Sequence, residues 1–111
     1  MNWLKKLWRF IFRKRPDLVL KWHEGDEPPH NLKRGQLVVA REGEELWAAA
    51  FICPCGCGER IELALLPEVK PHWELTSGAP KAPTLHPSVW RKVGCKSHFW
   101  VRQGKVQWCK E

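Results

Sequence analysis

Three thiols lie within five residues in the stretch Cys53-Pro54-Cys55-Gly56-Cys57-Gly58. Proline fixes one backbone angle and glycine permits positive φ, so the stretch predicts a turn that points several sulfurs at one place. Further along the chain, Cys95 and His98 add another thiol and an imidazole. Thiolate and imidazole are the ligands that zinc prefers, and structural zinc sites usually have four of them. The sequence therefore predicts a zinc site that joins the middle of the chain to its end.

The choice of ligands decides what else the site can do. The candidate ligands are Cys53, Cys55, Cys57, Cys95 and His98. If the four cysteines bind the metal, His98 is free to act as a base, whereas a metal-bound His98 leaves one cysteine spare and cannot be a base. We favour the four-cysteine set, which leaves no position for metal-bound water and makes the zinc structural; a catalytic zinc would need one weak ligand. Cys109 is expected to be a buried free thiol on the last strand.

A serine nucleophile is the second chemistry that the sequence offers. The chain contains three serines, Ser77, Ser88 and Ser97, and a serine attacks when a neighbouring base, usually histidine, takes its proton. Ser97 and His98 are adjacent, and adjacent side chains on a strand point to opposite faces. Either the chain turns after Cys95, or His98 serves a serine on a neighbouring segment, for which Ser88 is the candidate. The sequence does not indicate which carboxylate would complete a triad.

Length and cysteine usage restrict the class of protein. A chain of 111 residues is long enough for one domain with a modest core, which a metal site would help to stabilise. An odd number of clustered cysteines, without a visible secretory signal, favours metal binding in a reducing cytoplasm over disulfides. No apolar run approaches the roughly 18–20 residues that span a membrane. We therefore expect a cytoplasmic protein.

The apolar pattern predicts a mainly β fold, a small single domain of short antiparallel strands and hairpins stapled by the zinc site. Strands are expected at 17–23, 36–41, 46–52, 61–65, 72–76 and, as a final hairpin, 98–102 with 105–108. The cysteine-rich turn then joins two strands of one hairpin. Residues 77–83 contain glycine and two prolines and are expected to form a mobile loop.

The two ends of the chain carry its basic character. The net charge of the whole chain is +7, and residues 1–21 alone contain seven basic side chains and one acidic one. Within residues 1–16, apolar and basic positions alternate with helical spacing, which predicts a basic amphipathic helix that ends at Pro16, with the zinc-stapled β domain over 17–111. Three roles remain open for this helix: packing on its own domain, lying on an anionic membrane surface, or docking on a partner protein or nucleic acid.

Several segments together resemble a known family. They are Phe51–Gly58, His72-Trp73, Thr84–Trp90, Cys95–Val101 and Gly104–Trp108. The sequence resembles, over about residues 32–108, a small zinc-binding bacterial family that is encoded beside ubiquitin-like proteins and their activating and conjugating enzymes, in Bub-type operons. The resemblance implies a zinc-containing serine peptidase that processes or removes a ubiquitin-like protein. By position, Cys53, Cys55, Cys57 and Cys95 would hold the metal, and Ser88, Ser97 and His98 would include the nucleophile and the base.

Two other functions remain open at this point. A non-catalytic zinc module that binds a protein would have the same cysteines and no need for a Ser–His pair. A membrane-surface or nucleic-acid module would act through residues 1–15, and its binding would weaken steeply with salt. The partners expected from the resemblance are a ubiquitin-like protein or its conjugates, and the sequence does not indicate the oligomeric state.

Overall fold

A computed structural model describes residues 17–79 and 81–109, apart from the side chains of residues 77–79. The helix expected over residues 1–16, and the contacts expected of it, lie outside these residues and stay predictions. The described chain forms eight strands: β1 (Val19–Glu24), β2 (Gln36–Glu42), β3 (Glu45–Ile52), β4 (Arg60–Ala64), β5 (Glu74–Ala79), β6 (Ala82–Trp90), β7 (His98–Arg102) and β8 (Lys105–Trp108). The predicted mainly β fold is thereby confirmed.

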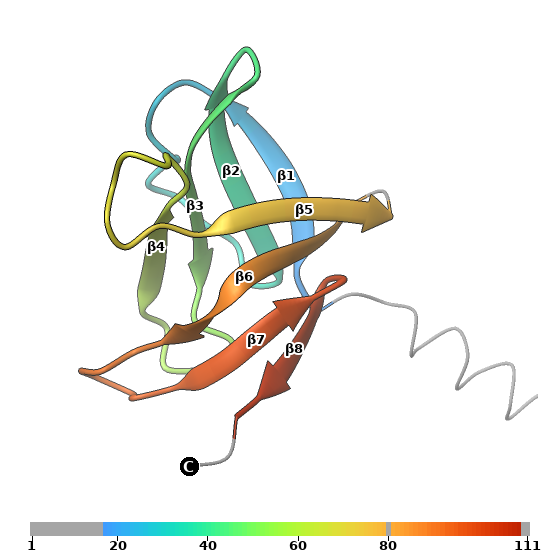
Figure 1. Ribbon diagram of the computed structural model, residues 1–111. Helices are drawn as coiled ribbons and strands as arrows, with labels where there is room; N and C mark the ends of the chain where they lie inside the picture. Colours follow the sequence, from blue (N-terminus) through green and yellow to red (C-terminus); the bar gives the residue numbers. More distant parts are fainter. Residues whose placement is uncertain (1–16, 80, 110–111) are drawn as a thin grey trace, which may run out of the picture.

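The strands form two four-stranded sheets, in the order β1-β2-β3-β4 and β5-β6-β7-β8 (Figure 1). Neighbouring strands are antiparallel, as predicted, except that β1 and β2 are parallel. A parallel pair needs a connection that runs back along the strand, and residues 25–35 provide it. The backbone N–H of Val19 then donates to the carbonyl of Gly35, 2.8 Å away, where the two strands start together.

The apolar core lies between the two sheets. Alternate residues of β2, β3 and β4 meet those of β6 and β7, as expected for strands with one buried face. The rings of Phe51 and Phe99, both fully buried, meet edge to face with centroids 6.2 Å apart and join β3 to β7. Phe51 precedes the cysteine-rich turn by two residues and Phe99 follows His98, so the core contact fixes the strands that lead into the site.

The segment over 77–83 differs from the expected loop. Residues 77–79 form the end of β5 and residues 82–83 the start of β6, with Ser77 paired to Pro83. Pro83 is buried, and its carbonyl accepts a hydrogen bond from the N–H of Gly104 at 2.7 Å. Proline tolerates a strand position where its missing N–H is not needed by the ladder, which is why the proline content misled the sequence-based prediction.

Strand β6 departs from regular pairing with β7. Leu85 is opposite Val101 and Val89 is opposite Phe99, so four residues along β6 correspond to two along β7. The extra residues form a bulge, and bulges re-aim side chains next to functional sites. Ser88 lies in this bulge.

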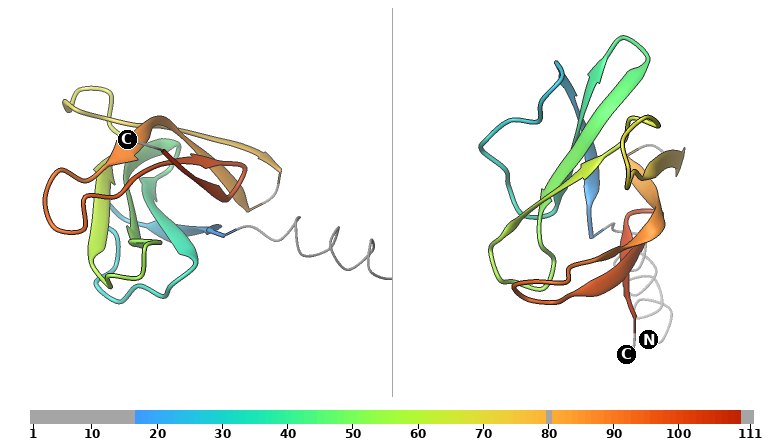
Figure 2. Two further views of the ribbon diagram at one scale, coloured as in Figure 1. Left: turned by 90° about the horizontal axis from the view of Figure 1, so that it is seen from below. Right: turned by 60° about the vertical axis from the view of Figure 1, so that its left-hand side comes forward.

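Two connections meet at the same end of the molecule. The turn between β3 and β4 carries three of the cysteines, and the loop between β6 and β7 carries Cys95. Figures 1 and 2 show the two connections side by side. Over residues 17–79 and 81–109, the chain contains no helix that is long and apolar enough to cross a membrane.

Replacing Phe51 with alanine tests the contact between the sheets. We expect the free energy of unfolding to fall by about 3–5 kcal/mol, because the change removes a buried ring and leaves a cavity. Val93→Ala is the matched control, since Val93 is 75% exposed and its truncation should change stability by less than about 0.5 kcal/mol. Urea unfolding followed by circular dichroism measures both, and equal midpoints would contradict the assignment of the core.

Candidate functional site

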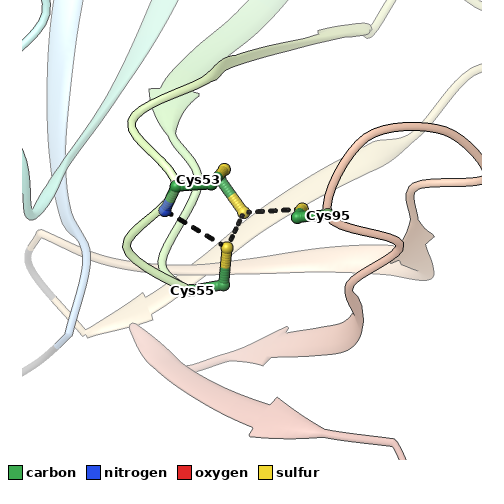
Figure 3. Close-up of side chains that lie close together, drawn as sticks. Cys53, Cys55 and Cys95 are labelled. Atoms are coloured by element: carbon green, nitrogen blue, oxygen red, sulfur yellow. Dashed lines mark hydrogen bonds between the residues drawn. The ribbon is translucent and has the colours of Figure 1, made fainter.

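The thiols of Cys53, Cys55, Cys57 and Cys95 lie within 4.8 Å of one another. The sulfur of Cys53 is 3.3 Å from that of Cys55 and 3.7 Å from that of Cys95. Figure 3 shows these three side chains pointing toward one another from the two connections. His98, the fifth candidate ligand, is not a member of this group. The structure therefore brings together the four-cysteine set that the sequence favoured.

The backbone of the turn explains how three sulfurs from adjacent positions converge. The N–H of Cys53 donates to the carbonyl of Glu59 at 2.8 Å, and the N–H of Gly56 donates to the carbonyl of Cys53 at 3.3 Å. Gly56 and Gly58 have φ of 97° and 82°, which residues with a side chain rarely adopt. These two glycines let the chain fold back within a few residues, so that the sulfurs of the turn lie close together.

The spacing of the sulfurs fits a bound metal ion. Four sulfurs at about 2.3 Å from a tetrahedral zinc lie about 3.8 Å from one another, close to the separations found. Burial raises the pKa of Cys53 to about 12, whereas the hydrogen bond with the hydroxyl of Ser97 lowers the pKa of Cys95 to about 6. A cation would stabilise all four thiolates, including the buried one that water does not reach. The four cysteines can therefore hold a metal ion.

Arg91 lies against the thiols, a contact that the sequence did not indicate. Its guanidinium lies 3.7 Å from the sulfur of Cys95 and 4.0 Å from that of Cys57, and it forms an ion pair with Glu59. The carboxylate of Glu59 raises the pKa of the guanidinium further. Four thiolates around a divalent cation would leave a net negative charge, which Arg91 would partly balance. The position of a basic residue four places before Cys95 was the available signal.

Ser97, one of the predicted catalytic residues, lies against the thiols. Its hydroxyl is 3.2 Å from the sulfur of Cys95 and 3.9 Å from that of Cys53. Its carbonyl accepts a hydrogen bond from the N–H of Arg91 at 2.8 Å, which closes the loop over 91–97. The side chains of Ser97 and His98 thus serve different partners, as the alternation along a strand requires.

Ser88 and His98 form a Ser–His pair. The hydroxyl Oγ of Ser88 lies 2.9 Å from Nε2 of His98, within hydrogen-bonding distance, and both side chains are half-buried. The bulge of β6 brings Ser88 beside the first residue of β7, ten positions away in sequence. A neutral imidazole at this distance can accept a hydroxyl proton, which is how a serine oxygen becomes a nucleophile.

Two tryptophans contact the Ser–His pair. The indole of Trp90 stacks on the imidazole of His98, with centroids 4.8 Å apart and planes 12° from parallel. The Nε1–H of Trp73 donates to the backbone carbonyl of Ser88 at 3.3 Å. Among the residues that the structure describes, no carboxylate forms a hydrogen bond or an ion pair with His98. Aromatic stacking therefore covers one face of the His98 ring.

Cys109 differs slightly from its prediction. It follows β8 instead of lying on it, and its side chain is half-buried. Its N–H donates to the carbonyl of His98 at 2.9 Å, so it helps to hold the first residue of β7. It does not belong to the group of four thiols.

The metal content of three variants tests the four-thiol group. We expect Cys95→Ser to lose bound metal, with an affinity at least about 100-fold lower. Removing a group that only supports a ligand costs about 10–100-fold in metal affinity, and removing a ligand itself should cost more. Cys109→Ser and His98→Ala should keep the wild-type content, since neither residue belongs to the group. Elemental analysis of the purified proteins gives the answer, and metal loss in His98→Ala would make the histidine a ligand.

Comparison with known proteins adds a family to this geometry. The sequence model of the family described as bacterial ubiquitination-like system serine protease (BubE) matches residues 24–109. No curated protein and no solved structure matches the chain. The matched region covers most of the chain, including the four clustered thiols, Ser88 and His98. The chain belongs to the BubE family of serine proteases of bacterial ubiquitination-like systems.

Proposed function

We propose that this protein is a zinc-containing serine peptidase that processes a ubiquitin-like protein or removes it from its conjugates. Ser88 is the nucleophile and His98 is the general base. The observation that carries the proposal is the 2.9 Å contact between the Ser88 hydroxyl and the His98 imidazole, in a chain whose family is one of serine proteases. The hydroxyl of Ser97, the other candidate nucleophile, contacts the sulfur of Cys95 instead of His98.

The chemistry follows from the two side chains. Nε2 of His98 takes the proton of Ser88 as the oxygen attacks the carbonyl carbon of the scissile amide. The imidazolium then gives that proton to the leaving amine, and an acyl-enzyme remains on Ser88. Water, activated by the same nitrogen, hydrolyses the ester and restores the hydroxyl.

Trp90 gives the base a fixed orientation in this scheme. Flat stacking at 4.8 Å leaves the Nε2 edge of the imidazole directed at Ser88 and limits rotation of the ring. The same contact favours the imidazolium that forms during the reaction, because a cation is attracted to the face of an indole. The indole therefore supports part of the role that a carboxylate has in a triad.

The four cysteines would hold a structural zinc ion. With four sulfur ligands, the ion would have no open position for water, and its contribution would be to stabilise the fold. The loop over 91–97 leaves β6 after Trp90 and enters β7 at His98, residues that are paired across the two strands. A metal that fixes Cys95 would thereby fix the separation of Ser88 and His98. Four reduced thiols suit a cytoplasmic location.

The substrate is an extended polypeptide tail with small residues near the scissile bond. Ser88 lies on the face of the sheet that also carries Trp90, 53% exposed, and the neighbouring rings of His86 and Trp100, whose centroids are 5.8 Å apart. Bulky aromatic rings on both sides of the Ser–His pair leave room for a chain without side chains, such as a glycine pair. The C-terminal tail of a ubiquitin-like protein has the extended form that this requires.

Cleavage of a ubiquitin-like precursor by three variants tests the proposal. We expect Ser88→Ala and His98→Ala each to reduce kcat by about 10³-fold or more, since the nucleophile and its base act as a unit. Ser97→Ala is the matched serine control and should retain activity within about tenfold, because its hydroxyl contacts sulfur. Mass spectrometry of the released tail measures the rate. Full activity in Ser88→Ala would refute the assignment, and an inactive wild type would favour a non-catalytic zinc module.

A further inference from the structure

A cavity of about 460 Å³ lies at the junction of the two sheets, lined by residues of β3 and β5 and of the segments beside them. Its apolar lining includes Leu46 of β3 and Leu75 of β5. Leu65, which follows β4, and Trp73, which precedes β5, also line it. These side chains also pack against the buried core, so the cavity is built on rigid elements. Its volume falls in the range of about 300–1,000 Å³ that ligand pockets occupy.

Three carboxylates line the same cavity. Glu44 and Glu45 come from the β2–β3 hairpin and Glu74 begins β5. All three are exposed, and within the described part of the chain none of them forms an ion pair, in contrast to Glu24, Glu59 and Glu62. The cavity therefore combines an apolar lining with negative charge that no side chain of the described protein neutralises.

Trp73 connects the cavity to the reaction site. Its ring lines the cavity, while its Nε1–H donates to the backbone carbonyl of Ser88. Trp73 is thus the contact between the cavity and the segment of β6 that carries Ser88. A substrate residue a few positions from the scissile bond could place its side chain in the cavity.

We propose that the cavity is a specificity pocket that binds an arginine side chain of the substrate polypeptide, near the bond that Ser88 attacks. The proposal rests on the proposed peptidase function and names the substrate chemistry of that site. The three methylene groups of arginine match the leucine lining, and its planar guanidinium can stack on the indole of Trp73. The carboxylates of Glu44, Glu45 and Glu74 provide the complementary charge.

A binding experiment on the full chain tests the pocket without requiring catalysis. The probe is Nα-acetyl-arginine methylamide, and the matched probe is its citrulline analogue, which has nearly the same shape and no charge. The Nε1–H resonance of Trp73 reports binding in an isotope-labelled Ser88→Ala protein. We expect the arginine probe to shift this resonance and the citrulline probe to bind at least about tenfold more weakly.

Charge-removing variants assign the effect to the cavity. Replacing Glu45 and Glu74 together with glutamine should weaken arginine binding about tenfold, and added salt should weaken it further. Glu27→Gln is the control, because Glu27 is exposed and does not line the cavity. A cleavage assay on proteins that keep Ser88 gives a second comparison. Citrulline in place of arginine should lower kcat/KM for the wild type and for Glu27→Gln, but not for the variant that carries both Glu45→Gln and Glu74→Gln.

The outcomes separate the pocket from the peptidase. Arginine binding that requires Glu45 and Glu74 supports the pocket, even if no peptide is cleaved and the peptidase function fails. Equal binding of the arginine and citrulline probes, or an unmoved Trp73 resonance, overturns the pocket, even if Ser88 proves to be the nucleophile. A Trp73 resonance that changes with protein concentration alone would show a second copy in the cavity and would also overturn it.

Discussion

Four sulfur atoms within 4.8 Å of one another bring the β3–β4 turn to the β6–β7 loop, and that loop leads into β7 at His98. The loop separates Trp90 from His98, and the hydrogen bond between Arg91 and Ser97 closes it. A bound cation would stabilise four thiolates that otherwise repel one another and, at Cys53, lack water. A metal ion bound by these thiols would therefore also constrain the position of His98.

One basic and one acidic side chain lie beside the thiols. Arg91 faces the sulfurs of Cys57 and Cys95 and is itself held by Glu59. A Cβ added to Gly94 would lie 3.1 Å from the carboxylate of Glu59, so the loop approaches the turn closely at this point. The basic side chain of Arg91 and the absence of a side chain at Gly94 together allow the two connections to meet.

The Ser–His pair is built by two neighbouring strands of one sheet. Ser88 and His98 come from neighbouring strands, and the bulge in β6 supplies the offset that puts Oγ beside Nε2. On the adjacent side, Trp73 links the backbone of Ser88 to a cavity with three unpaired carboxylates. The Ser–His pair and the cavity thus share contact with one tryptophan, which packs against the core.

The sequence by itself determined the mainly β fold, the last hairpin over 98–102 and 105–108, and the set of thiols able to hold a metal. Strand alternation, turn residues and cysteine spacing are local properties, and they are written in consecutive residues. The tertiary structure decided which serine meets His98, because that depends on a bulge and on pairing between β6 and β7. It also decided that β1 and β2 run parallel, that Arg91 faces the sulfurs, and that Trp90 stacks on His98. These contacts depend on strand pairing, on the bulge in β6 and on the path of the loop over 91–97, which no run of consecutive residues specifies.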